Sequence, residues 1–368
     1  MKKISLSDIF STNFRSERTK KDRYVSLGIK NHTLLSTNIN LNLRSSRLEK
    51  RSIDDMPFKV LDAPGILDDF YLNILEWSKN DLVCIGLSES FYQYNYHTKK
   101  VKEILTNNEG NFVTGITCSK SPIVSEDIVA VGCNNGKVKL LNNGKEFMRL
   151  NASESRVCAM SWNDHILSCG TKQGVVINYD LRTGAEVKRY SNHVGEICGL
   201  KWSPDKRFLA SGGNDNQVRI YELRTSIPRH IITAHNSAVK ALDWCPWKVA
   251  ELITGGGTKD KTIKIWDTNE CKLLKSVDVK SQVCTLNYIE KYKEVVSSHG
   301  FSNNEIIMWK ATNLKKMSVF GKHENRVLNV AISPDGSKMA SVSADENLKF
   351  WKLFDSEKAI PRNESIFR

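Results

Sequence analysis

The sequence has 368 residues, of which 40% are hydrophobic and 8% aromatic, and its formal net charge is +13. This composition supports a large buried core, and no apolar run approaches the roughly 18 residues that a membrane-spanning helix needs. The nine cysteines include no C-x-x-C pair, which favours reduced thiols over a disulfide framework or a metal site. We therefore expect a soluble intracellular protein without a metal, a cofactor or a membrane partner, and the opening "MKKISLSDIF" predicts no signal peptide.

The first segment, residues 1–56, is basic and holds 12 Lys and Arg against 6 Asp and Glu. Its richness in Ser, Asn and Arg predicts a mostly disordered arm. A basic arm can bind nucleic acid or dock onto a protein. The arm lacks the interleaved aromatic residues of a single-strand platform, so we expect protein docking and no nucleic-acid partner.

A repeated pattern of apolar alternation occupies residues 57–355, in segments such as "EICGLKWSPD" and "TIKIWD". The third strand of each unit ends near a marker residue, and successive markers are 38 to 47 residues apart: Tyr94, Leu141, Tyr179, Tyr221, Trp266, Trp309 and Trp351. A period of about 40–45 residues with four short strands is typical of WD-repeat propellers. Seven markers predict an all-β, seven-bladed β-propeller, in one ring rather than the two domains that length alone allows. Residues 356–368 remain as a short C-terminal tail.

Three histidines begin blades and precede an aspartate by 22 to 25 residues: His193–Asp215, His235–Asp260 and His323–Asp345. Such pairs occur in general-base catalysis. Three equal copies around a ring instead indicate a buried hydrogen bond that ties an outer loop to an inner turn.

Cys158, Cys198 and Cys284 share one strand position, which we assign to Ala241 in blade five. A small apolar packing role explains this set better than a catalytic thiol. The Gly-rich turns "SGGND" and "TGGGT" precede no helix, so a phosphate-binding loop is not expected. No enzyme signature remains, and we expect a non-catalytic protein.

The sequences that connect the strands are more specific than the repeat itself. "FKVLDAPGILDDFYLNILEWS", "AVKALDWCPW", "TGGGTKDKTIKIW" and "SHGFSNNEIIMWK" resemble, in order, the propeller of the Fizzy and Fizzy-related family. Members of this family are substrate-recruiting coactivators of the anaphase-promoting complex, a ubiquitin ligase. The resemblance covers residues 57–355 and does not separate the two branches. It implies recruitment of degron-bearing substrates such as cyclins and securin, contact with spindle-checkpoint proteins, and a nuclear and cytoplasmic location.

The two chain ends resemble the family's ligase-docking motifs. "DRYVSLG" matches the start of the motif D-R-[FY]-I-P-x-R, although Ser26 and Gly28 replace its proline and last arginine. The matching residues are Asp22, Arg23, Tyr24 and Val25. The family ends in Ile-Arg, and this chain ends with Ile366, Phe367 and Arg368. The resemblance implies that both ends fasten the propeller to the ligase, because tethered weak contacts reinforce one another.

The resemblance also implies two degron sites on the propeller. A destruction box, R-x-x-L, needs carboxylates for its arginine, and we assign Asp69 and Glu346 to one groove between the first and last blades. A KEN degron needs amides, a cation and an acid, which we expect on the inner turns near the channel. The assigned residues are Asn214, Asn216, Thr258, Gln282, Arg326 and Glu76.

Another class of function stays open, because WD propellers serve many functions. The alternative is a generic WD-repeat scaffold for another nuclear complex, or a propeller that uses its basic arm on nucleic acid. The two motifs at the chain ends, together with Asp69 and Glu346, favour the coactivator.

Overall fold

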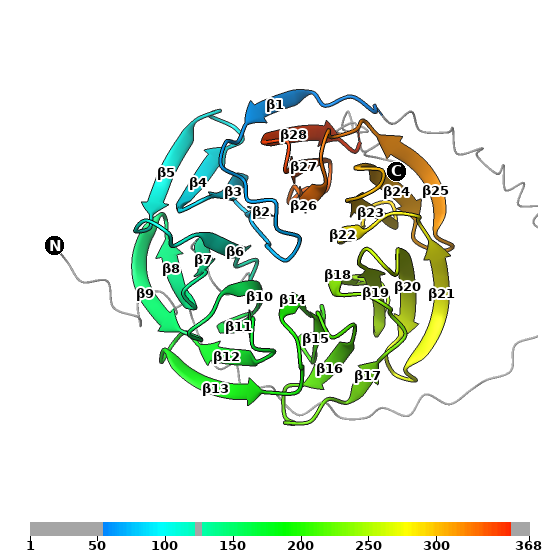
Figure 1. Cartoon of the computed structure of the whole chain (residues 1–368), viewed down its shortest axis with the longest axis horizontal. Helices are drawn as coiled ribbons and strands as arrows, with labels where there is room; N and C mark the ends of the chain where they lie inside the picture. The colour runs from blue at the N-terminus through cyan, green and yellow to red at the C-terminus, as the bar shows by residue number, and fades with distance from the viewer. Residues whose placement is uncertain (1–53, 122–126, 355–368) are drawn as a thin grey trace, which may run out of the picture. The chain divides into compact units, whose positions relative to one another are not determined.

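The described part of the computed structural model, residues 54–121 and 127–354, is built from β-strands. These residues form seven four-stranded sheets of antiparallel strands, which lie as blades around a central channel (Figure 1). The seven-bladed propeller expected from the repeat is confirmed, and every marker residue lies on the third strand of its unit. In this part of the chain, no helix has the length and apolar character needed to cross a membrane.

The first four blades follow the chain from residue 75 to residue 232. Blade one contains β2 (Leu75–Trp77), β3 (Leu82–Leu87), β4 (Ser90–Asn95) and β5 (Val101–Thr106). Blade two contains β6 (Val113–Cys118), β7 (Ile128–Cys133), β8 (Lys137–Asn142) and β9 (Lys145–Asn151). Blade three contains β10 (Val157–Asn163), β11 (Ile166–Thr171), β12 (Val176–Asp180) and β13 (Ala185–Tyr190). Blade four contains β14 (Ile197–Trp202), β15 (Phe208–Gly213), β16 (Val218–Glu222) and β17 (His230–Ile232).

The last three blades complete the ring, and the seventh takes its outer strand from the other end of the propeller. Blade five contains β18 (Val239–Trp244), β19 (Glu251–Gly256), β20 (Thr262–Asp267) and β21 (Lys272–Asp278). Blade six contains β22 (Val283–Ile289), β23 (Glu294–His299), β24 (Ile306–Lys310) and β25 (Lys315–Phe320). Blade seven contains β26 (Val327–Ile332), β27 (Lys338–Ser343), β28 (Asn347–Lys352) and β1 (Lys59–Asp62).

Strand β1 closes the ring by pairing with β28 (Figure 1). In this register Lys59 lies opposite Phe350 and Asp62 lies opposite Asn347. Phe350 also packs against Trp77 of blade one, with ring centroids 5.9 Å apart. The closing strand therefore joins the last blade to the first, and it removes the free edge that β28 would otherwise expose.

The core lies between neighbouring blades, where the second strands β7, β15, β19 and β23 are buried along their whole length. The outer strands are mostly exposed, as in β5 and β21. Gly212 shows how closely the blades approach, because a Cβ at this position would lie 2.1 Å from the carbonyl oxygen of Val239 in the next blade.

The three His–Asp pairs have the structural role that their repetition indicates. His193 Nδ1 lies 2.9 Å from Asp215, His323 Nδ1 lies 2.8 Å from Asp345, and His235 contacts Asp260. The far nitrogen of each ring meets a strand hydroxyl: Ser211, Thr254 and Ser341. In blades five and seven a tryptophan Nε1–H donates to the same hydroxyl. Each such chain of hydrogen bonds is buried in its own blade.

The assignment of Ala241 to the cysteine position is wrong by one residue. Pairing between the first and second strands shows that the position following the first valine or isoleucine is a bulge in blades three to six. Cys158, Cys198 and Cys284 occupy this bulge, and Lys240 occupies it in blade five. A match by side-chain size misled the sequence interpretation, because the bulge is not restricted to small residues.

Candidate functional site at the mouth of the central channel

A short segment between β1 and β2 crosses the mouth of the channel, which is the end where the innermost strands begin. We call residues 68–73 the crossing segment; the loop that contains it reaches into the centre of the ring (Figure 1). The Asp68 carboxylate lies 2.6 Å from Arg326 of blade seven, and the Asp69 carboxylate lies 2.5 Å from Arg156 of blade three. Two adjacent acids therefore tie the segment to two different blades.

The arginine that binds Asp69 is itself held from a third side. Arg156 donates to both carboxylate oxygens of Glu196, at 2.6 and 2.7 Å. Asp69 Oδ1 also accepts from the backbone N–H of Tyr71 at 2.9 Å, which fixes a local turn. The carboxylate of Asp69 is thus committed within the protein.

Aromatic side chains follow the two acids because the crossing segment covers an apolar cluster. Phe70 is 7% exposed and packs with Cys198, Ala238 and Cys284. The Tyr71 hydroxyl donates to Asn214 Oδ1 at 2.9 Å. The segment is therefore anchored by ion pairs at its start and by ring packing at its middle.

A pocket of about 270 Å³ lies beside the crossing segment, between the turns of blades four and five and the start of blade six. It brings together four of the residues expected in the KEN site: Asn214, Asn216, Thr258 and Gln282. Phe70 and Tyr71 form one wall. We call this the mouth pocket. Gln282 Oε1 is buried without a hydrogen-bond partner among the described residues, as expected for a site that awaits a polar ligand.

Arg326, a fifth expected residue, lies next to this pocket. A Cβ on Gly300 would lie 2.4 Å from Gln282 Oε1 and 3.3 Å from Arg326 Cβ, so Gly300 separates the two side chains narrowly. The guanidinium also lies over the ring of Phe301, 4.9 Å from its centroid. The structure thus places a cation beside the amides, with Asp68 as its present partner.

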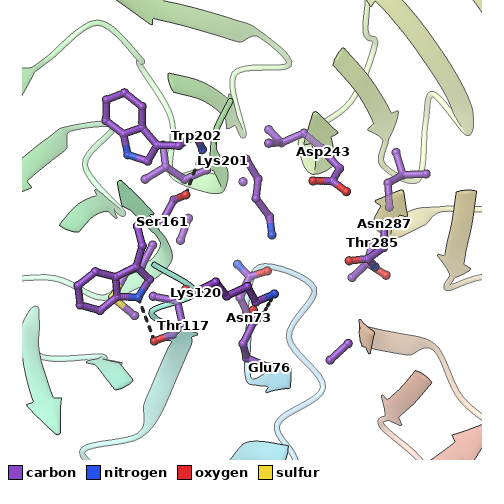
Figure 2. Close-up of a pocket in the computed structure, with 18 of the residues that line it drawn as sticks. Asn73, Glu76, Thr117, Lys120, Ser161, Lys201, Trp202, Asp243, Thr285 and Asn287 are labelled. Atoms are coloured by element: carbon purple, nitrogen blue, oxygen red, sulfur yellow. Dashed lines mark hydrogen bonds and ion pairs between the residues drawn. The ribbon is translucent and has the colours of Figure 1, made fainter. Parts of the chain in front are cut away.

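Glu76, the sixth expected residue, does not belong to this site. It lines a separate cavity of about 440 Å³, which we call the lower channel and which continues along the innermost strands beyond the mouth. There it forms a 2.7 Å ion pair with Lys120 (Figure 2). Although burial opposes the charged form, the ammonium groups of Lys120 and Lys201 hold the pKa of Glu76 below its usual value. The Glu76 side chain faces the lower channel and not the mouth pocket. The expected pairing of Glu76 with a KEN lysine is therefore wrong.

The shared groove expected for Asp69 and Glu346 is also corrected. Glu346 Oε1 accepts from the backbone N–H of Gly65 at 2.9 Å, whereas Asp69 is bound to Arg156 at the channel mouth. The acid that β1 places beside Glu346 is Asp62, opposite Asn347 on β28. Asp62 is exposed. The alternation of residues in "FKVLD" is the sequence signal for a strand that ends at Asp62.

Two residues of the described site, Arg156 and Glu196, were not predicted, although they share one strand position with residues that were. The residue directly before the first valine or isoleucine of the innermost strand faces the mouth in five blades: Arg156, Glu196, Ala238, Gln282 and Arg326. Reading this position as one set would have shown Arg156 and Glu196 beside the two expected members. Asp22 to Val25 and Ile366 to Arg368 lie outside the described residues.

No group of His, Cys, Asp and Glu side chains suited to a metal ion occurs in residues 54–121 and 127–354. Cys158 and Cys198 are buried, and burial raises the pKa of both thiols. The described site is thus an arrangement of amides, ion pairs and aromatic rings, which is chemistry for binding a polar peptide.

Comparison with known proteins identifies the family. A family model described as the CDC20/Fizzy WD40 domain matches residues 61–351. The chain belongs to the CDC20/Fizzy family. It is 39% identical over 333 residues to "Cell division cycle 20.1, cofactor of APC complex" from Arabidopsis thaliana, a match that covers 85% of this chain and 71% of the relative.

Other members of the CDC20/Fizzy family match less of their own length. The chain is 38% identical over 325 residues to "Anaphase-promoting complex subunit cdc20" from Dictyostelium discoideum, which covers 86% of this chain and 64% of the relative. It is 36% identical over 311 residues to "Protein FIZZY-RELATED 3" from Arabidopsis thaliana, which covers 84% and 64%. The chain thus spans less than two thirds of these two relatives, and both branches of the CDC20/Fizzy family are represented.

A solved structure agrees with this placement in the CDC20/Fizzy family. A chain in "Crystal Structure of Mitotic Checkpoint Complex" is 38% identical and superposes with a TM-score of 0.79, over 84% of this chain and 99% of that chain. The likeness therefore extends over almost the whole of the solved chain.

Proposed function

We propose that this protein is a coactivator and substrate-recognition subunit of the anaphase-promoting complex, and that it recruits proteins that carry KEN and destruction-box degrons. The observation that carries the proposal is the mouth pocket, in which Asn214, Asn216, Thr258 and Gln282 converge beside Arg326. These residues come from three blades, and they present amide and hydroxyl groups to one space. The proposed role is recruitment without catalysis.

The chemistry of the mouth pocket suits a KEN peptide. Amide groups donate and accept together, so Asn214, Asn216 and Gln282 can bind the peptide backbone and its asparagine. The glutamate of the degron would bind Arg326 and displace Asp68, whose carboxylate is 48% exposed. The lysine of the degron would extend along the crossing segment. Tyr71 provides an aromatic wall for the aliphatic part of that lysine.

The edge where β1 meets β28 suits a destruction box. Asp62 and Glu346 are neighbours across this pair of strands, and two carboxylates can receive one guanidinium. We propose this pair in place of Asp69 and Glu346. The site lies at the junction of the last blade with the first and is separate from the mouth pocket.

Partners and location follow from the same proposal. The arm, through Asp22 to Val25, and the tail, through Ile366 to Arg368, would fasten the propeller to anaphase-promoting complex subunits. Cyclins, securin and spindle-checkpoint proteins are the proposed further partners, and the nucleus and cytoplasm the proposed location. The names of the relatives and of the checkpoint-complex structure support the assignment of anaphase-promoting complex subunits and checkpoint proteins as partners.

Peptide titration tests the proposed recognition. Asn214→Ala combined with Arg326→Ala should weaken a KEN peptide about tenfold or more, because it removes an amide and a charged donor, and should leave an R-x-x-L peptide unaffected. Asn269→Ala combined with Arg224→Ala removes the same side-chain types from exposed turns and should change neither affinity. Equal loss of both peptides in the first variant would contradict separate sites.

A pull-down tests the proposed docking. The full chain should retain anaphase-promoting complex subunits from a cell extract, and a chain without residues 366–368 should retain less while its thermal unfolding stays unchanged. Unfolding of the propeller on removal of the tail would contradict the docking role of Arg368.

A further inference from the structure

Lys240 is a buried cation that lies beneath the crossing segment and contacts its backbone. It lies on β18 at the bulge position and is 4% exposed. Lysine is almost never buried so fully without a partner. Among the described residues no carboxylate lies within ion-pair distance of it, so its hydrogen-bond partners are neutral groups.

The partners of Lys240 are two backbone carbonyls. Its Nζ donates to Leu72 O at 2.8 Å and to Leu328 O at 2.9 Å. It also lies 5.6 Å from the centroid of the Phe70 ring. One ammonium group therefore links blade five to the crossing segment and to blade seven.

These contacts lie directly behind the wall of the mouth pocket. Leu72 follows Phe70 and Tyr71, which form that wall, and Tyr71 in turn binds Asn214. A hydrogen bond to the Leu72 carbonyl fixes the backbone one residue beyond Tyr71. Asn73 is held in the same way, since its Nδ2 donates to the carbonyls of Cys158 and Cys198.

We propose that Lys240 is a positioning residue for the proposed degron pocket, and that its ammonium holds the crossing segment so that Phe70 and Tyr71 form the pocket wall. The identity of the ligand, a polar KEN-type peptide, rests on the proposed function. The positioning role of Lys240 rests on the structure alone. Lys240 does not touch the peptide. It acts through Leu72, and this distinguishes it from the amides that line the pocket.

The surroundings of Lys240 make its charge sensitive to mildly alkaline pH. Burial lowers the pKa of Lys240 to about 8. The titratable groups that act on its charge are Asp69 on the crossing segment and three thiols, Cys158, Cys198 and Cys284, and Tyr71 lies on the same segment. Burial raises the pKa of all three thiols and of Tyr71, so these groups stay neutral where Lys240 loses its proton. Arg156 and Arg326, which pair with the segment's acids, stay charged throughout.

Hydrogen exchange tests the positioning without a ligand. In Lys240→Met at pH 7, the backbone N–H groups of Leu72 and Asn73 should exchange at least about tenfold faster than in the unmodified chain, because local opening no longer breaks the ammonium contacts. Lys201→Met is the matched control, since this lysine lies on the innermost strand of blade four and points into the lower channel (Figure 2). Unchanged exchange in Lys240→Met would overturn the proposal.

Peptide affinity and its pH profile test the consequence. An N-acetylated, C-amidated KEN peptide should bind Lys240→Met about tenfold more weakly, while an R-x-x-L peptide is unaffected. In the unmodified chain KEN affinity should fall several-fold between pH 7 and pH 9, a range in which the peptide's own lysine stays charged. Lys240→Met should lack this step. Equal KEN affinity of Lys240→Met and the unmodified chain would overturn the proposal, and unchanged R-x-x-L affinity shows that the variant is folded.

The two arms separate the inference from the proposed function. If the unmodified chain binds neither peptide, the proposed function fails, and the exchange rates of Leu72 and Asn73 still decide whether Lys240 positions the segment. If both peptides bind but Lys240→Met weakens them equally, Lys240 supports the whole ring, and the specific positioning role is wrong.

Discussion

At the scale of residues, Asp68 and Asp69 are adjacent in the chain but bind arginines of different blades. Asp69 is committed to Arg156, which Glu196 also holds. Asp68 holds Arg326 through a more exposed pair. The two acids differ in their place in the crossing segment: Asp69 begins a turn, in which the Tyr71 N–H donates to its carboxylate, whereas Asp68 precedes that turn. Sequence motifs identified the two acids but not their partners, which depend on where the segment crosses the channel.

The first prediction concerns the internal competitor of the degron. Asp68→Asn should strengthen KEN-peptide binding by up to about fivefold, because an exposed ion pair is worth roughly 0.2–1 kcal/mol and Arg326 would no longer have to release it. Fluorescence anisotropy with a labelled peptide measures the change. Asp278→Asn is a matched control, since Asp278 has a similar exposed fraction, 47%, and also forms an ion pair, in its case with Lys280. Weaker binding would mean that Asp68 itself contacts the peptide.

The second prediction concerns the corrected arginine anchor. Asp62→Asn and Glu346→Gln should each weaken an R-x-x-L peptide several-fold, the loss being limited because Asp62 is exposed and its pairing is screened by solvent. Isothermal titration calorimetry gives both affinities. Asp69→Asn should spare this peptide, because Asp69 is bound to Arg156. The original assignment would be restored if only Asp69→Asn abolished R-x-x-L binding.

At the scale of elements, the repeat period predicted the blades well because each blade is a local unit of about 40 residues. The marker residues end third strands that pack between blades, and their apolar character is visible in the sequence. The bulge in the innermost strands was not visible, since a bulge is a backbone irregularity without a fixed side-chain type. Ala241 was assigned to the position of Lys240 because its side chain is closer to cysteine in size.

The third prediction concerns closure by β1. A chain that begins at residue 63 should unfold at a temperature several degrees lower than a chain that begins at residue 54, because β28 loses its partner strand and Trp77 loses part of the packing around Phe350. Differential scanning calorimetry measures both. The chain beginning at residue 54 retains β1 and serves as the control. Identical unfolding temperatures would show that β1 does not close the ring.

At the scale of the whole molecule, buried neutral histidines make the folded state less stable as the pH falls. Burial lowers the pKa of His235 and His323, and that of His299 to about 3. His299 was not among the paired histidines of the sequence interpretation. It contacts Ser297, which also accepts from Trp309, so blade six builds a similar chain from a second-strand histidine.

The fourth prediction concerns pH. The unfolded chain binds protons at these histidines near pH 6.5, whereas the folded chain does not, so the free energy of unfolding should fall as pH decreases below about 6.5. Urea unfolding at pH 7.5 and pH 5.5 measures the loss. His299→Gln should reduce this pH dependence, even if the variant is less stable at pH 7.5. Equal stability of the unmodified chain at both pH values would contradict the buried neutral state.

The site itself could be predicted only in part, for a physical reason that holds across the molecule. Asn214, Asn216, Thr258 and Gln282 lie on turns that the fold brings together in any propeller of this register. The assignment of Glu76 to the KEN site was wrong because an innermost strand runs along the channel. A residue a few positions along such a strand faces the lower channel instead of the mouth pocket. Long-range placement of this kind depends on the three-dimensional path of the chain.

Competition between the two degron peptides tests the central claim, that this propeller carries two separate degron sites. A labelled KEN peptide bound to the full chain should be displaced by unlabelled KEN peptide and not by R-x-x-L peptide. A labelled R-x-x-L peptide should show the reverse behaviour. Mutual displacement would contradict separate sites at the channel mouth and at the β1–β28 edge, and failure of both peptides to bind would contradict the proposed recognition itself.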